Sequence, residues 1–189
     1  MDAKTQFTGS EAGSTPPYQS RTIALVGLMG AGKSTVGRRL ASALGRDFYD
    51  SDDEIEAAAG LSVSDIFAIH GEAEFRRGEA RVLERLLKNP PHVLATGGGA
   101  YLDPNTRKLL RDCAITVWLN ADLETLWERV NRRNHRPLLQ SPDARNVLTR
   151  LLEERTPIYS EADLVINSVE EPHAAAVKEI IAAVKDWTP

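Results

Sequence analysis

A chain of 189 residues is long enough for one domain with a substantial core and too short for two. Hydrophobic residues make up 42% of it and charged residues 26%, which excludes collagen-like and wholly disordered chains. The net charge of −4 argues against a general affinity for nucleic acid or an anionic membrane surface. An anionic ligand must therefore be held by local groups.

The first twenty residues are rich in Thr, Ser, Gly and Pro and predict a disordered N-terminal tail. One folded domain is expected over residues 21–189, because no interior linker divides them. No apolar stretch approaches 18 residues, the start lacks a secretory signal, and the single Cys113 cannot form an internal disulfide. The sequence therefore predicts a cytoplasmic protein.

Four short apolar runs predict buried strands, at residues 22–27, 92–96, 115–119 and 164–167, and a shorter apolar run at 47–50 is a further strand candidate. Helical periodicity lies between and after them, at 34–44, 72–88, 105–111, 123–132, 144–160 and 174–187. This alternation predicts an α/β fold with a central five-stranded parallel sheet covered on both faces. The polar, proline-containing segment around 131–142 predicts a mobile loop.

A phosphate-binding motif follows the first predicted strand. Residues 27–34, GLMGAGKS, match G-x-x-x-x-G-K-[ST] between a strand and a helix, a context that disfavours a mere connecting turn. Its backbone N–H groups and the helix N-terminus suit a polyphosphate, Lys33 suits the β and γ phosphates, and Ser34 suits Mg²⁺. The chain is therefore predicted to be a P-loop NTPase-type three-layer sandwich that binds a nucleoside triphosphate. The nucleotide contacts expected from the loop are Gly30, Ala31, Gly32, Lys33, Ser34 and Thr35.

Several carboxylates follow the second predicted strand, at the sheet edge where ligands gather in open α/β folds. One can hold the Mg²⁺ shell, and a second can accept a proton from an attacking hydroxyl. Capping of the next helix is the alternative role. We favour capping for Asp53 and Glu54, and a functional role for Asp50 and Asp52, which alternate at the strand end.

The chain from about residue 23 to residue 167 resembles the shikimate kinase family. Besides the phosphate loop, the matching blocks are DSD at 50–52, GE at 71–72, FRR at 75–77 with Glu79, GGG at 97–99, RPLL at 136–139 and RTPIY at 155–159. The loop is shared by many families, whereas the order and spacing of the other blocks are much more specific. The resemblance implies transfer of the γ-phosphoryl group of ATP to the 3-hydroxyl of shikimate, in aromatic amino acid biosynthesis. It also implies Mg²⁺ as the cofactor and ATP as the co-substrate.

The resemblance further implies roles in the acceptor site. Asp50 would lie near Mg²⁺, and Asp52 would hold shikimate hydroxyls and serve as the candidate base. Arg76, Gly98 and Arg155 would bind the substrate carboxylate, because two guanidinium groups beside a backbone N–H form a suitable anion clamp. Glu79, three residues after Arg76, would steady that guanidinium from the same helical face.

The loop around 131–142 would act as a closing lid. Arg136 would neutralise charge near the transferring phosphoryl group, and Arg132 or Arg133 would stack on adenine. The expected catalytic residues are thus Lys33, Asp52 and Arg136, with Arg133 and Arg136 added to the nucleotide contacts.

Three alternatives remain at this point. Another small-molecule kinase, for gluconate or a nucleoside monophosphate, is disfavoured because an uncharged acceptor would leave the predicted arginine clamp without a carboxylate. A catalytically silent kinase-like module is disfavoured because the phosphate loop and both aspartates occur together. A nucleic-acid-dependent ATPase is disfavoured by the net negative charge of the chain. The expected partners are ATP and shikimate, with no nucleic acid and no membrane, and the protein is expected to be a monomer.

Overall fold

The computed structural model describes residues 17–131, 143–168 and 173–189. Its five described strands form one sheet in the order β2-β3-β1-β4-β5, and every neighbouring pair is parallel. The bounds are β1 Thr22–Val26, β2 Phe48–Asp50, β3 Val93–Ala95, β4 Ala114–Asn120 and β5 Leu164–Asn167. The predicted five-stranded parallel sheet is confirmed.

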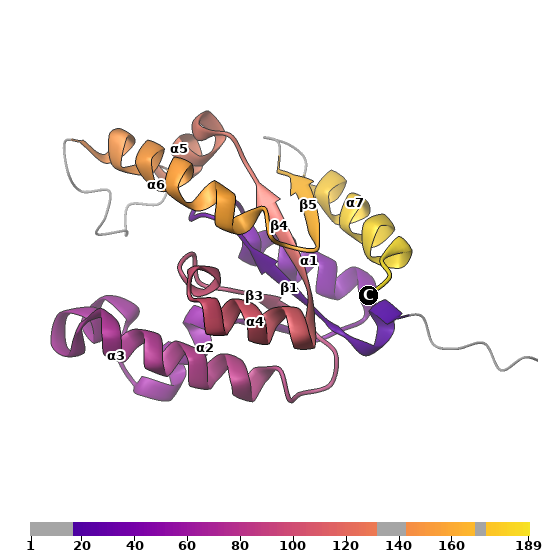
Figure 1. Cartoon of the computed structure of the whole chain (residues 1–189), viewed down its shortest axis with the longest axis horizontal. Coiled ribbons are helices and arrows are strands. Elements are labelled where there is room, and N and C mark those ends of the chain that lie inside the picture. Colours follow the sequence, from indigo (N-terminus) through magenta and orange to yellow (C-terminus); the bar gives the residue numbers. More distant parts are fainter. Residues whose placement is uncertain (1–16, 132–142, 169–172) are drawn as a thin grey trace, which may run out of the picture.

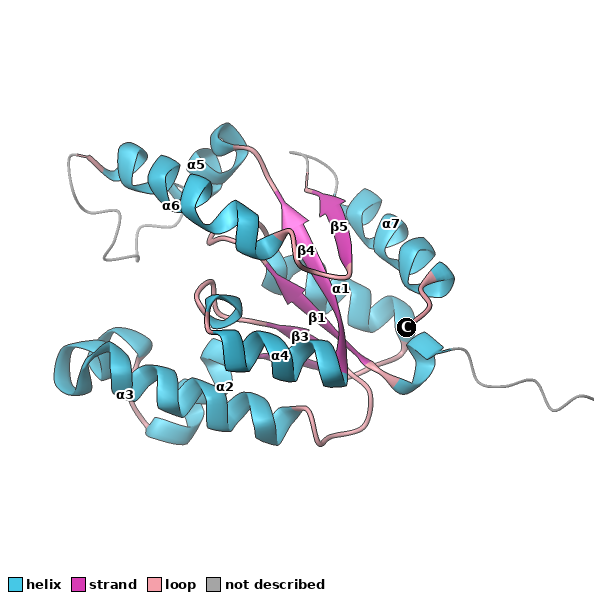
Figure 2. Cartoon of the chain, in the orientation of Figure 1, coloured by secondary structure: helices cyan, strands magenta, loops and turns pink. Residues whose placement is uncertain are grey.

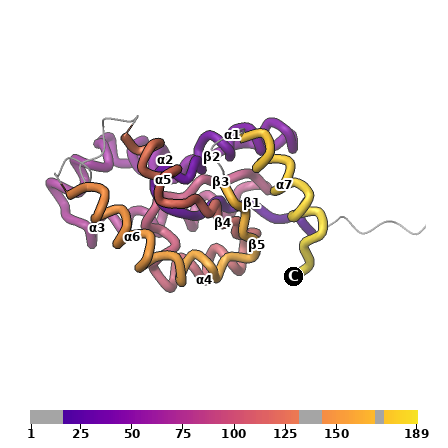
Figure 3. Tube along the Cα trace, turned by 90° about the horizontal axis from the view of Figure 1, so that it is seen from above, coloured from indigo at the N-terminus to yellow at the C-terminus, as the bar shows by residue number. Residues whose placement is uncertain are grey.

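Helices cover both faces of the sheet, which makes three layers (Figure 3). Helices α1 (Lys33–Leu44) and α7 (His173–Asp186) lie on one face, and α4 (Pro104–Cys113) and α6 (Ala144–Tyr159) lie on the other (Figure 3). Helix α5 (Leu123–Asn131) packs against α6. Helices α2 (Ser51–Ala59) and α3 (Val63–Leu86) pack against each other (Figure 1). Helix α2 also contacts β2. None of the described helices is long and apolar enough to cross a lipid bilayer.

Strand β1 lies at the centre of the sheet and is buried at all five residues. Helices pack on both of its faces, so the strand is a continuous apolar run rather than an alternating one. Figure 2 shows how the loops at the carboxyl ends of β1 and β3 gather along the same edge of the sheet.

Strand register aligns three segments at that edge. Asp50 of β2 is paired with Ala95 of β3, and Ala95 is paired with Leu25 of β1. Two residues beyond these partners come Asp52, Gly97 and Gly27. Because parallel strands end at a common edge, the acidic segment, the glycine run and the phosphate loop are brought side by side.

Two differences from the sequence prediction concern local structure. Helix α3 begins at Val63, nine residues before the predicted start at Glu72, and its backbone departs from helical geometry at Gly71 (φ 78°, ψ 170°). The segment before this kink is too short for a clear 3.6-residue periodicity, so its packing against α2 decides its structure.

At the N-terminus, Pro17–Ser20 forms a 3-10 helix (η1) where the sequence predicts a disordered tail. The Arg46 guanidinium donates to the carbonyl of Tyr18 at 2.8 Å, and this long-range contact supplies the order. The tail prediction for residues 1–16 and the lid prediction for 132–142 lie outside the described residues.

Candidate active site

The phosphate loop has the backbone that its glycines require. Gly27 and Gly30 have φ values of 136° and 85°, a region that disfavours other residues. A Cβ on Gly27 would lie 2.8 Å from the carbonyl oxygen of Leu119. Helix α1 begins just after Gly32 with no side-chain cap, so its first N–H groups remain directed at the loop. This end of the helix has the geometry of an anion-binding site.

Lys33 lies across the phosphate loop. Its Nζ donates to the carbonyl oxygens of Gly27 at 2.7 Å and Leu28 at 3.0 Å. The ammonium charge is therefore held at the mouth of the loop, close to the N-terminus of α1. Gly30, Ala31, Gly32, Ser34 and Thr35 lie in the same loop and the first turn of α1.

Asp50 joins the loop to the acidic segment. Its Oδ2 accepts from the Ser34 hydroxyl at 2.6 Å, and its Oδ1 accepts from the Asp52 backbone N–H at 3.1 Å and so caps α2. Asp53 and Glu54 are not the N-cap of α2, which is Asp50, but both lie in its first turn, where acidic groups oppose the helix dipole as the structural alternative expected. They also form ion pairs, with Arg38 and Arg85 respectively.

The donor set at Ser34 and Asp50 fits a hard divalent cation such as Mg²⁺. The described residues contain no cluster of three or more His, Cys, Asp or Glu side chains that would form a full protein cage. Mg²⁺ does not require one, because it commonly binds one or two protein oxygens together with waters and substrate phosphates. A hydroxyl and a carboxylate beside a phosphate loop meet that requirement.

The glycine run after β3, at residues 97–99, lies between the acidic side chains and the phosphate loop. A Cβ on Gly97 would lie 2.6 Å from Asp52 Oδ1 and 3.0 Å from Glu79 Oε1, so the two carboxylates pack directly against its backbone. A Cβ on Gly98 would lie 3.5 Å from the backbone nitrogen of Met29 in the phosphate loop. The acidic groups and the phosphate loop therefore meet across one short backbone segment.

Two guanidinium groups flank the same segment. Arg76 donates to Glu79 at 2.7 Å and to Glu72 at 3.3 Å, and a side chain on Gly99 would clash with its guanidinium. Arg155 donates to the carbonyl oxygen of Gly98 at 3.3 Å. The structure thus brings together the four residues predicted for the acceptor site, which are Asp52, Arg76, Gly98 and Arg155.

A model of the shikimate kinase family matches residues 29–185. The chain belongs to the shikimate kinase family. It is 58% identical over 159 residues to a shikimate kinase of Paramagnetospirillum magneticum, covering 84% of this chain and 82% of that protein. It is also 53% identical over 169 residues to a shikimate kinase of Caulobacter vibrioides, covering 89% of this chain and 84% of that protein.

The fold agrees with the family. A shikimate kinase from Acinetobacter baumannii, solved in complex with shikimate, superposes with a TM-score of 0.84 at 40% identity and covers 88% of this chain and 94% of that one. The predicted family and the P-loop NTPase-type fold class are therefore confirmed, and the alternative kinase families are set aside.

Glu79 is the most deeply buried carboxylate in the site of this shikimate kinase family member. Glu79 is 2% exposed, and its Oε1 has no hydrogen-bond partner among the described residues. Burial raises the pKa of Glu79, the ion pair with Arg76 opposes this rise, and the charges of Asp52 and Asp103 add to it. Burial therefore disfavours the charged form of Glu79, and the Arg76 guanidinium partly offsets this effect.

Tyr159 is a site residue to which the sequence prediction gave no role, although it lies in the matching block RTPIY at 155–159. Its hydroxyl donates to the carbonyl oxygen of Gly98, which also accepts from Arg155. Its ring stacks with those of Tyr101 and Trp118, with centroid distances of 6.4 and 6.1 Å. Burial raises the pKa of Tyr159, which keeps the hydroxyl a donor. A signal was available, because Tyr159 lies four residues after Arg155 and so on the same helical face.

Ser51 is a second missed residue. Its buried hydroxyl accepts from the Gly97 backbone N–H at 2.8 Å and so ties α2 to the glycine run. Only its position inside the DSD block suggested a role. Arg132, Arg133 and Arg136 lie outside the described residues, so the roles expected for them stay predictions.

Proposed function

We propose that this member of the shikimate kinase family transfers the γ-phosphoryl group of ATP to the 3-hydroxyl of shikimate at the site around residues 97–99. The observation that carries the proposal is the position of this segment. It contacts the phosphate loop through Gly98 and the Asp52 carboxylate through Gly97, and Arg76 and Arg155 flank it. A phosphoryl donor and a carboxylated acceptor can therefore be held next to each other.

On the donor side, the phosphate loop would bind the polyphosphate through its backbone N–H groups and the N-terminus of α1. Ser34 and Asp50, joined by a 2.6 Å hydrogen bond, would hold Mg²⁺, which when bound supplies charge neutralisation at the phosphates. Lys33 would exchange its contacts with Gly27 and Leu28 for phosphate oxygens and balance the charge that develops during transfer. Arg136 would add a second positive charge, and Arg132 or Arg133 would contact the adenine.

On the acceptor side, Arg76 and Arg155 would bind the shikimate carboxylate together with Gly98. Asp52 would then orient the 3-hydroxyl toward the phosphate loop and accept its proton. Orientation is the greater part of this role, because a loose phosphoryl-transfer transition state requires little early proton removal. Glu79 would act through Arg76 by fixing its guanidinium with the 2.7 Å ion pair.

The wider organisation is also a proposal. We expect residues 21–189 to work as one domain with a lid at 131–142, and the protein to act as a monomer on small molecules alone, without nucleic acid or membrane. We expect it to work in the cytoplasm, because the reaction consumes ATP and the single Cys113 suits a reducing compartment.

The direct test is an acceptor panel. The protein is incubated with Mg·ATP and shikimate, gluconate, nucleoside monophosphates or simple hydroxy acids, while ADP release is followed. Shikimate alone should accelerate release above background hydrolysis, and the product should carry one new phosphate ester. Equal rates with and without shikimate would remove the assignment.

We predict that Tyr159→Phe raises KM for shikimate while kcat and KM for ATP stay nearly constant. The substitution removes one of the two donors that hold the Gly98 carbonyl, and a buried hydrogen bond contributes on the order of 1 kcal/mol. The corresponding rise in KM is about fivefold. Steady-state kinetics with each substrate varied in turn will measure it.

Tyr101→Phe is the matched control for this prediction. Tyr101→Phe also removes a tyrosine hydroxyl from the same aromatic stack. The Tyr101 hydroxyl, however, lies beside Thr116 and not at the glycine run. Equal kinetic effects of the two substitutions would show that Tyr159 contributes only packing.

We predict that Glu79→Gln removes a pH-dependent loss of stability. Because the pKa of Glu79 is raised in the folded protein, the folded state binds the proton more tightly than the unfolded chain. The free energy of unfolding therefore falls as pH rises from the ordinary pKa near 4.5 through the raised value. Urea unfolding across this range should show a smaller fall in Glu79→Gln than in the wild type. Glu74→Gln, a change at a more exposed carboxylate of the same helix, should leave the fall in place.

A further inference from the structure

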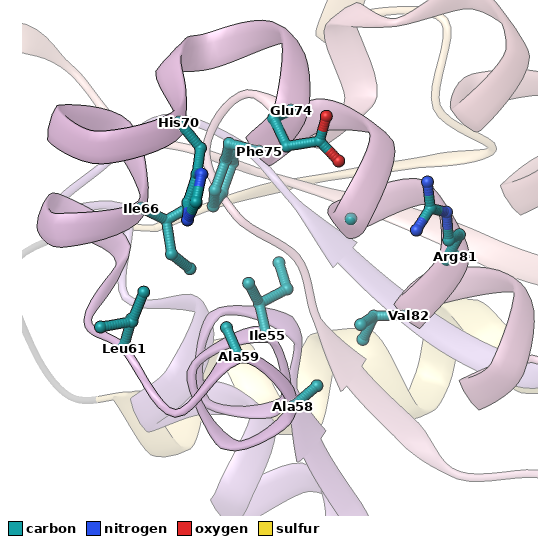
Figure 4. A pocket seen from close by; sticks show the side chains of 11 residues that line it. Ile55, Ala58, Ala59, Leu61, Ile66, His70, Glu74, Phe75, Arg81 and Val82 are labelled. Carbon is teal, nitrogen blue, oxygen red and sulfur yellow. The ribbon is translucent and has the colours of Figure 1, made fainter.

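A cavity of about 410 Å³ lies between α2 and α3, outside the site described above (Figure 4). Its walls are mostly apolar and include Ile55, Ala58 and Ala59 from α2 and Phe75 and Val82 from α3. The volume falls within the range of small-molecule sites, about 300–1,000 Å³. None of these five side chains belongs to the phosphate loop or to the predicted acceptor site.

Gly78 lines this cavity from the interior of α3. It has no positive φ, and a Cβ built on it would meet no atom within 4 Å. Neither backbone conformation nor crowding therefore requires glycine here, although glycine weakens a helix interior relative to alanine. The physical effect of this glycine is to leave the space between the two helices open.

Arg81 supplies a cation at one end of the cavity, with Leu61 and His70 at the other (Figure 4). Within residues 17–131, 143–168 and 173–189, no ion pair or side-chain hydrogen bond is found for Arg81. Glu74, the carboxylate on the wall, is already paired with Arg77. The lining thus presents one uncompensated positive charge beside an apolar space.

We propose that this cavity is a second ligand site, which binds a small molecule with an apolar body and a single carboxylate. The apolar body would fill the space left by Gly78, Ala58 and Ala59. The carboxylate would pair with the Arg81 guanidinium, in a geometry that suits bidentate contact. This assignment uses no residue of the proposed active site.

The test uses 4-phenylbutyrate as the probe and its uncharged amide as the comparison. The full chain, labelled with ¹⁵N and saturated with shikimate, is titrated with each compound and followed by amide chemical shifts. Saturation with shikimate blocks the arginine clamp, so the probe cannot report on the active site. Shift changes should be concentrated at residues that line the cavity, such as Ala58, Ala59 and Gly78, and should be small at Asp52 and Arg76, which lie on the same two helices. The carboxylate should bind at least about fivefold more tightly than the amide.

Two variants test the mode of binding. Arg81→Gln should remove the preference for the carboxylate while the amide still binds. Gly78→Leu should abolish binding of both compounds by filling the cavity, and it should raise the melting temperature because leucine favours the helix. Arg39→Gln, a change at an exposed arginine of α1, should leave both affinities unchanged.

The proposal is overturned if shikimate prevents binding of the probe, if the largest shift changes lie at Asp52 and Arg76 or outside the cavity lining, or if the Gly78→Leu protein binds as tightly as the wild type. Binding is measured directly and not through phosphoryl transfer, so these results do not depend on whether kinase activity is found; only the use of shikimate as the blocking ligand rests on the proposed acceptor site.

Discussion

Replacing Asp52 with asparagine is expected to lower kcat for shikimate phosphorylation by about 10²-fold or more, because misplacement of a reacting group costs about that much and loss of the proton acceptor adds to it. The amide keeps the size of the side chain beside Gly97 but removes the charge that orients and deprotonates the hydroxyl. The capping bond of α2 is unaffected, because it joins the Asp52 backbone N–H to Asp50. Single-turnover measurements with saturating ATP and shikimate will separate this chemical defect from weaker binding.

Asp53→Asn provides the control for that prediction. Asp53 is the next residue on α2 and carries the same group, but its side chain is 67% exposed and pairs with Arg38. Its loss should change kcat less than twofold, because this exposed side chain pairs with Arg38 and with none of the groups predicted for the phosphate loop or the acceptor site. A rise in KM for shikimate with unchanged kcat in Asp52→Asn would show that the carboxylate binds the acceptor without taking its proton.

Replacing Lys33 with methionine is the second change expected to have a large effect, a fall in kcat of about 10²- to 10³-fold. Methionine keeps the length of the side chain but removes the Lys33 ammonium group, which is held over the phosphate loop. Loss of a single preorganised donor to transition-state charge typically costs this much. Binding of shikimate alone, measured by calorimetry, should be unchanged.

Arg155→Ala should show the opposite pattern. It removes a guanidinium from the acceptor side, so KM for shikimate should rise while binding of ATP is kept. Similar defects in both variants would contradict the proposed division between a donor side and an acceptor side. The comparison therefore tests the two halves of the site separately.

Local pattern was sufficient for the strands and most helices. The apolar run at residues 22–26 ends at a phosphate loop, and this combination indicates a strand that is buried on both faces, as the structure shows. The helical segment before Gly71 was not predicted, because eight residues are too few for periodicity and its packing against α2 decides its structure.

In the candidate site, too, the sequence predicted which residues take part and the structure showed how they are arranged. The resemblance predicted Asp50, Asp52, Arg76 and Arg155, and the structure brings them to one edge of the sheet, although their roles stay predictions until the variants are measured. It also shows that Asp50 caps α2 with one oxygen and accepts from Ser34 with the other. Motif spacing could not reveal this double role, because it depends on the relative position of α1 and α2.

The sequence by itself determined the family, the parallel sheet and the chemical groups available for phosphoryl transfer, because these depend on short patterns along the chain. Only the tertiary structure decided which groups meet. The pairing of Asp50 with Ala95 and of Ala95 with Leu25 places Asp52, Gly97 and Gly27 side by side. The tertiary structure likewise brings the Tyr159 hydroxyl to the Gly98 carbonyl and leaves a cavity beside Gly78. The physical reason is that contacts between distant segments follow from strand register and helix packing.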